Sequence, residues 1–172
     1  MVKAIKVMLI PNNVQKTKMF QYAGASRFAY NWALAREIEN YEKGGKFLSD
    51  AELRKEFTKL RHSDEYAWLL SISNNVTKQA IKDACTAYKN FFRGLQKFPR
   101  FKSKKRSMPK FYQDNIKIQF SNTHVKFEGF SSSRKRNKQK LNWVRLAEHG
   151  CIPTDAKYMN PRISFDGLNW WI

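Results

Sequence analysis

Hydrophobic residues in the first half of the chain follow one short apolar segment and then recur at helical spacing. Residues 3–10 are rich in Ile, Val, Met and Leu, and Pro11-Asn12-Asn13 follows, so the pattern predicts a strand that ends in a turn. Residues 16–43 then carry apolar side chains three and four positions apart, before Gly44-Gly45. This spacing predicts a long helix whose buried side is formed by Phe20, Gly24, Phe28, Trp32, Ala35 and Ile38.

Three more helices are predicted before residue 95. Ser49 and Glu52 have the spacing of a capping box, in which each side chain bonds to the backbone N–H of the other residue. Leu53, Phe57 and Leu60 follow as an apolar stripe. Residues 63–70 predict a short helix with an acidic first turn, and residues 74–93 predict a longer one that ends at a glycine.

The second half of the chain changes to a period of two. Residues 116–120 alternate, residues 121–123 suit a turn, and residues 124–127 begin a returning strand. Residues 141–146 and 162–165 predict further strands, and Asp166-Gly167 predicts a hairpin turn into residues 168–172. The order predicts an α+β fold, in which an antiparallel β-barrel closed by the first strand (1-13 and 107-172) is interrupted by a helical bundle (14-106).

The net charge of the chain and the distribution of its charged residues indicate the class of partner that it binds. The formal net charge is +19 over 172 residues, which favours a polyanionic partner. Residues 84–113 contain nine Lys or Arg and no Asp or Glu, whereas eight of the fourteen acids fall between Glu37 and Glu65. A solvated linker is the alternative reading of such a basic stretch. Its aromatic residues favour nucleic-acid binding, because a linker has no need of rings.

Other features exclude several classes of protein. Cys85 and Cys151 have no second ligand at zinc-finger spacing, so we expect a reduced chain with no metal or cofactor of its own. No apolar run has the length of a bilayer span, and residues 1–10 have no signal-peptide character. These observations predict a cytoplasmic, nucleoid-associated protein without a membrane partner.

Four segments carry a resemblance to a known family: residues 27–34, 88–94, 98–105, which begin with Phe-Pro-Arg-Phe-Lys, and 162–167. Their order and spacing resemble the amino-terminal half of TnpB proteins. Those are transposon-encoded RNA-guided DNA nucleases, similar to the miniature type V CRISPR nucleases. The resemblance implies an oligonucleotide-binding-like barrel, called the wedge domain, and a helical recognition lobe. It also implies guide RNA and a short target-adjacent motif on double-stranded DNA as partners.

The chain also departs from the family. TnpB proteins continue into a RuvC nuclease domain with three carboxylates that hold two metal ions, and into a zinc-binding insertion. This chain ends at Ile172, so we expect no DNA cleavage by it, and we expect magnesium or manganese and zinc only in the missing nuclease half. Two alternatives remain open: a stand-alone RNA- or DNA-binding regulator derived from TnpB, and one subunit of a split nuclease. A separate RuvC chain or a second copy would then be a partner.

Two groups of residues are candidates for reading the DNA motif. Side chains able to pair with base edges share one face at the start of the fourth helix, namely Asn74, Asn75, Lys78, Gln79 and Lys82. The alternative is a solvated helix start capped by Asn74. The resemblance places Tyr30 and Asn31 near DNA, and the alternative there is burial of the Tyr30 ring.

The candidates for contacts with the nucleic-acid backbone are cationic. They are Arg27, Lys89, Arg93, Arg100, Lys102, Lys104, Lys105, Arg106, Arg134, Lys135 and Arg136. Arg27 has an alternative as the ion-pair partner of an acid from a neighbouring helix. Phe98 and Phe101 are expected to turn inward, because Pro99 fixes a bend between them.

Overall fold

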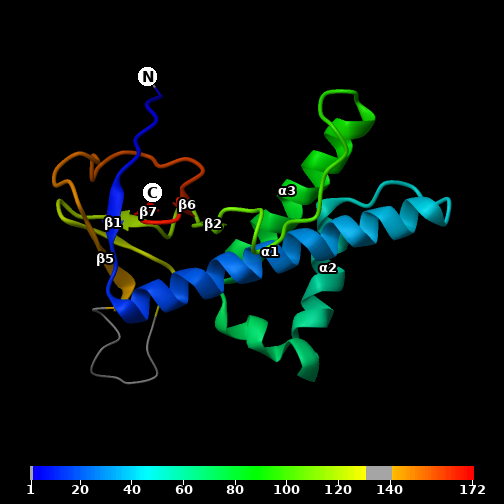
Figure 1. Ribbon diagram of the computed structural model, residues 1–172, viewed down its shortest axis with the longest axis horizontal. Helices are drawn as coiled ribbons and strands as arrows, with labels where there is room; N and C mark the ends of the chain where they lie inside the picture. Colours follow the sequence, from blue (N-terminus) through cyan, green and yellow to red (C-terminus); the bar gives the residue numbers. More distant parts are fainter. Residues whose placement is uncertain (1, 131–140) are drawn as a thin grey trace. The chain divides into compact units, whose positions relative to one another are not determined.

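The structure is a computed structural model that describes residues 2–130 and 141–172, and it confirms the α+β class (Figure 1). The chain divides into two compact units. The first is built from Met1–Ala23 and Met108–Ile172, and the second from Gly24–Ser107. The first unit contains a β-sheet and the first turns of α1, and the second contains the rest of the helices.

The first unit is organised by a seven-stranded antiparallel sheet in the order β2-β6-β7-β1-β5-β4-β3. Its strands are β1 (Met8–Ile10), β2 (Lys110–Tyr112), β3 (Gln119–Phe120), β4 (His124–Lys126), β5 (Trp143–Leu146), β6 (Arg162–Phe165) and β7 (Trp170–Trp171). The first strand lies in the middle, between β7 and β5. The end strands β2 and β3 do not pair within the described residues, so the predicted closure of a barrel by the first strand is wrong.

One face of the sheet forms the core of this unit. Along the strands, every second side chain lies on this face. The buried ones are Leu9, Phe111, Val125, Val144, Leu146, Ile163 and Trp170. The first turns of α1 (Asn13–Glu42) pack on this face through Tyr22, whose ring centroid lies 5.6 Å from that of Phe111 and 5.0 Å from that of Phe130. Burying such a ring stabilises the fold by about 1.5–3 kcal/mol.

Turn chemistry explains the main difference from the predicted strands. The alternating residues 116–120 form a strand only at Gln119–Phe120, and Ile116 is 89% exposed. The Asp114 carboxylate accepts hydrogen bonds from the backbone N–H groups of Ile116 and Lys117. These bonds fold residues 114–117 into a turn ahead of β3. Strand β2 was not predicted, because its three residues lie inside the basic stretch.

The second unit contains most of α1, together with α2 (Asp50–Arg61), the 3₁₀ helix η1 (Asp64–Ser71) and α3 (Asn74–Phe92). The capping box is confirmed, since Ser49 Oγ accepts from Glu52 N–H and Glu52 Oε2 accepts from Ser49 N–H. The predicted buried side of α1 is partly wrong. Phe20 is 44% exposed, while the buried positions include Ala25, Ala29 and Ala33, because close packing favours small residues that a search for large apolar side chains overlooks.

Candidate nucleic-acid interface

The most cationic part of the structure is residues 93–107, which we call the basic segment. Its end is an ordered turn, in which Ser107 N–H donates to the Ser103 carbonyl at 2.9 Å and Arg106 N–H donates to Ser103 Oγ at 3.2 Å. Lys104, Lys105 and Arg106 are exposed in this turn, and Arg93 and Arg100 are exposed before it. Within the described residues, none of these five side chains has an ion-pair partner.

Asn31 holds the basic segment against α1. Its side-chain Nδ2 donates to the Lys102 carbonyl and its Oδ1 accepts from the Lys102 N–H, both at 2.8 Å. The two bonds engage both ends of the amide, so Asn31 acts as a clamp on the main chain of the segment. The residue that the sequence assigned to DNA readout thus has a contact inside the second unit.

Tyr30 lies next to the same clamp. The ring is buried, with 7% exposed, and the Lys102 ammonium lies 3.7 Å from its centroid in a cation–π contact. Burial and the nearby negative charge of Asp83 raise the pKa of the Tyr30 phenol, so it stays neutral. Gln79 Nε2 donates to Asp83 Oδ1 at 2.8 Å. The structure therefore brings Tyr30, Asn31, Lys102 and, through Asp83, Gln79 into one neighbourhood.

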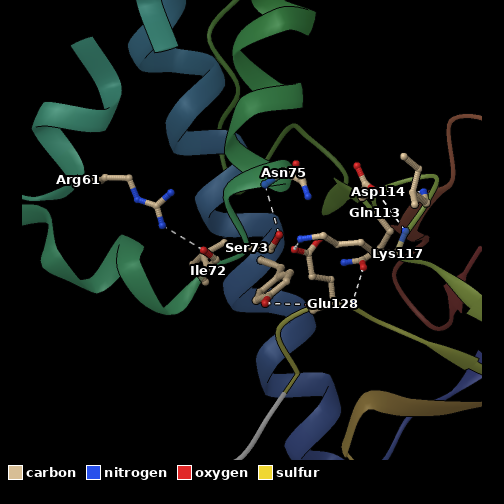
Figure 2. A network of polar contacts seen from close by, with 10 residues as sticks. Arg61, Ile72, Ser73, Asn75, Gln113, Asp114, Lys117 and Glu128 are labelled. Carbon is tan, nitrogen blue, oxygen red and sulfur yellow. Dashed lines mark hydrogen bonds and ion pairs between the residues drawn. The ribbon is translucent and has the colours of Figure 1, made fainter. Parts of the chain in front are cut away.

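The start of α3 is supported by a buried arginine. Arg61 donates from Nη2 to the Ile72 carbonyl (Figure 2) and to the Leu69 carbonyl. Its Nη1 donates to Asn74 Oδ1 at 2.7 Å. Desolvation lowers the pKa of the Arg61 guanidinium. The helix cap is Ser73, whose Oγ accepts from Asn75 N–H, so Asn74 does not cap the helix. Arg61 was not among the residues predicted from the sequence, because its role depends on carbonyls that only the fold brings together.

A groove of about 350 Å³ runs between α2 and α3 beside this helix start. Asn74 and Lys78 line one wall, and Arg54 and Lys55 of α2 line the other. Phe57 and Ile81 give it an apolar floor. Lys78 and Lys82 are exposed, whereas Asn75 and Gln79 are half-buried. The groove thus joins predicted residues of α3 with cations of α2 that the sequence did not single out.

The sheet carries a second set of cations that sequence analysis missed. On the face opposite the core, Lys6 lies over the Trp171 ring at 4.6 Å, Arg162 over Tyr112 at 5.5 Å and Lys126 over Trp143 at 5.9 Å. The described strands contain no Asp or Glu. The alternation of buried and exposed positions in these short strands was the available signal, since it places the three aromatic residues away from the core.

Several late acids serve the structure of the first unit. Asp166 accepts from Leu168 N–H, Asn169 N–H and Trp171 Nε1, and these hydrogen bonds lower its pKa to about 2. It thereby closes the predicted hairpin between β6 and β7. Glu128 pairs with Lys117 at 2.6 Å, and its backbone N–H donates to Gln113 Oε1 (Figure 2).

The other predicted residues are dispersed. Arg27 is half-buried and Lys89 is exposed. Arg134, Lys135 and Arg136 lie outside the described residues. Phe98 is 45% exposed and Phe101 is 55% exposed, so the expectation that both turn inward is wrong; the buried residue is Pro99 itself.

No group of three His, Cys, Asp or Glu side chains in residues 2–130 and 141–172 is placed to hold a metal ion. None of the described helices has the length and apolar character needed to cross a membrane.

Matches to known proteins agree with the family resemblance that the four sequence segments carry. A family profile described as a helix-turn-helix domain matches residues 1–46. In the structure, the described residues of this range form β1 and one continuous helix, α1, rather than two helices joined by a turn.

Two curated proteins are also similar. One, from Escherichia coli (strain K12), is provisionally named RNA-guided DNA endonuclease InsQ and is 32% identical over 142 residues, which are 83% of this chain and 35% of that protein. Another, from Streptomyces pristinaespiralis, carries the provisional name RNA-guided DNA endonuclease and is 29% identical over 105 residues, which are 61% of this chain and 26% of that protein. The chain spans about a third or less of the length of these relatives. Together with the four sequence motifs, these matches confirm that the chain is a relative of the transposon-encoded TnpB family.

Proposed function

We propose that this chain is the nucleic-acid-binding portion of a TnpB-like RNA-guided nuclease, with guide RNA and double-stranded DNA as its partners. The names of its relatives support this, since both are described as RNA-guided DNA endonucleases. The observation that carries the proposal is the basic segment. Residues 84–113 contain no acid, and an ordered turn presents three exposed cations together, namely Lys104, Lys105 and Arg106.

The electrostatic reason is general. Neighbouring cations repel one another, and a polyanion removes this repulsion while releasing its own condensed counterions. The three cation–aromatic pairs on the sheet offer a second basic surface. In this proposal the sheet serves as the oligonucleotide-binding-like wedge that contacts the guide RNA. The helix-turn-helix name adds no geometry to the argument, because residues 13–42 form a single helix.

For DNA, we assign the start of α3 and the groove beside it. Lys78, Lys82, Arg54 and Lys55 carry charge suited to phosphates there. Asn75 and Gln79 supply amides suited to adenine edges. Asn31 and Tyr30 then contribute mainly by holding Lys102 and the basic segment in place.

Binding without cleavage is part of the proposal. Asp114, Glu128 and Asp166 already serve a turn, an ion pair and a hairpin. Magnesium or manganese and zinc are assigned to a nuclease half outside this chain. Metal-dependent cutting of matched DNA by the purified chain with guide RNA, abolished by one Asp or Glu substitution, would contradict this.

The decisive experiment measures affinity for structured RNA and for duplex DNA against salt concentration. If about six phosphates are neutralised, affinity falls by about a thousandfold between 50 and 200 mM salt. An affinity that is constant over this range contradicts the proposal.

Motif readout has its own test. Gln79→Ala is expected to weaken binding to motif-bearing duplex by about 1–3 kcal/mol with little change on scrambled duplex. Lys82→Ala is the matched control and should weaken both equally, because a phosphate contact carries no sequence information. Both are compared at fixed salt with RNA present, after the preferred motif has been selected from a random pool. Equal losses for Gln79→Ala on both duplexes would show that this face only positions the DNA.

A further inference from the structure

The second unit carries a cluster of six aromatic rings, four of them exposed, that the proposed function does not use. We call it the aromatic cluster; its members are Tyr41, Phe47, Tyr88, Phe91, Phe92 and Phe98. Tyr41 is 59% exposed, Phe92 is 52% exposed, and Phe47 and Phe98 are each 45% exposed. These are rings that folding normally removes from water, so this surface has the character of a binding site.

The rings support one another. Tyr88 is buried at the centre of the cluster, and its centroid lies 5.1 Å from that of Phe92 and 6.1 Å from that of Phe98. Phe47 stacks on Tyr88 with an interplanar angle of 16°, and Tyr41 lies 5.3 Å from Phe92. Because the side chains already restrain each other, a flat partner would bind them with little further loss of rotamer freedom.

The charges beside the cluster select the partner. Cations adjoin its members in sequence, namely Lys46, Lys89, Arg93 and Lys97, while Glu42 is the acid next to Tyr41. A second copy of this chain would bring the same cations and a further +19 of formal charge against them. A partner that combines flat apolar faces with negative charge meets both features of the surface, and an unpaired nucleic-acid strand is such a partner.

We propose that the aromatic cluster binds an unpaired stretch of nucleic acid by stacking its bases, while the neighbouring cations contact its phosphates. Duplex does not fit as well, because its base faces are covered by neighbouring base pairs. This proposal rests on nucleic-acid binding as proposed above and adds the form of nucleic acid that this surface takes.

The test measures how much the bases contribute to affinity, separately from the phosphates. Affinities of the full chain are measured for a twelve-nucleotide oligouridylate and for an abasic ribose-phosphate strand of the same length and charge. The base-bearing strand is expected to bind at least tenfold more tightly, since each stacked base contributes on the order of tenfold. Oligodeoxythymidylate with its abasic counterpart tells whether RNA and DNA strands are equivalent. Salt-dependent binding of the abasic strands reports the proposed electrostatic function by itself.

Variants assign the effect to the cluster. Phe92→Ala and Phe47→Ala should each reduce affinity for the oligouridylate by about tenfold without changing affinity for the abasic strand or a duplex. Phe92→Tyr keeps a ring and should bind as the unmodified chain does. Ile116→Ala, which removes an exposed apolar side chain from the other unit, is the matched control.

Two results would overturn the proposal. One is equal loss on base-bearing and abasic strands, which would make the rings structural; thermal unfolding of each variant checks for this directly. The other is a change in sedimentation of the free chain on Phe92→Ala without any dependence on bases, which would assign the cluster to a second copy.

Discussion

Two regions of the second unit use their cations in opposite ways. Between residues 36 and 56, cations are paired with acids: Arg36 with Glu39 and Glu56, Lys43 with Glu39, and Arg54 with Asp50. Hydrogen bonds from Lys43 and Arg36 lower the pKa of Glu39. In the basic segment, a turn and the Asn31 clamp hold the main chain, and residues 84–113 contain no Asp or Glu.

The difference shows what surface pairing achieves. Exposed ion pairs stabilise a protein by only about 0–1 kcal/mol each. The main effect of the acids around residues 37–56 is therefore to cancel the positive field on that region. The basic segment keeps its field, and main-chain hydrogen bonds rather than charges give it order.

The strongest test exchanges equal amounts of charge in the two regions. Replacing Arg100, Lys104, Lys105 and Arg106 by Gln should lower affinity for structured RNA by about a thousandfold at 100 mM salt and reduce the salt slope by about 3 to 4. The matched control replaces Arg36 and Lys43 by Glu, which lowers the net charge by the same four units within the paired region. Similar losses in both variants would mean that overall charge, rather than the basic segment, determines binding.

One acid in the first of these regions is buried instead of paired. Glu37 is 1% exposed, its Oε2 accepts from Leu48 N–H at 3.2 Å, and burial raises its pKa to about 7. The Glu52 charge raises the pKa further, and the Cys85 thiol, whose own pKa is raised to about 12, stays protonated beside it. The carboxyl is thus neutral in the folded chain under mildly acidic conditions.

The raised pKa of Glu37 makes the free energy of unfolding depend on pH, and it also determines the direction of that dependence. The folded chain binds the Glu37 proton more tightly than the unfolded chain, so the free energy of unfolding should fall as pH rises from about 4.5 to about 7, by at most about 3 kcal/mol. Glu37→Gln should remove this dependence and make the variant more stable than the unmodified chain at pH 8, with little difference at pH 4.5. Urea unfolding at the two pH values measures it, and a variant that is less stable at pH 8 would contradict the argument.

A smaller effect is expected from the clamp. Asn31→Ala removes both hydrogen bonds to Lys102 and should lower the free energy of unfolding by about 1–2 kcal/mol. Hydrogen exchange at the Lys102 amide should become faster, because its acceptor is gone. Gln96→Ala, at an exposed position nearby in sequence, serves as the control. An unchanged exchange rate at Lys102 would show that the turn alone orders the basic segment.

Sequence predicted what local chemistry determines. The capping box at Ser49, the Asp166 hairpin and the bounds of α3 depend on residues a few positions apart, and all were found. The centre position of β1, the strand β2 and the alanine-rich buried side of α1 depend on elements far apart in the chain, and these were missed. The same holds for the site: cations and amides were identified by type, but the pairing of Asn31 with Lys102 spans 71 positions.

The smallest expected effect comes from replacing acids in the paired region instead of cations in the basic segment. Glu39→Gln with Glu56→Gln would leave Arg36 and Lys43 without their acids, while the helices keep their main-chain bonds. The free energy of unfolding should change by less than about 1 kcal/mol, because the lost pairs are exposed. Affinity for nucleic acid should rise a few-fold at 50 mM salt, and this gain should disappear near 1 M salt, where the Debye length is only about 3 Å. Thermal unfolding and salt titration of the double variant measure both quantities. A large loss of stability would show that these ion pairs hold α1 and α2 together, and that the two regions differ in structure and not only in field.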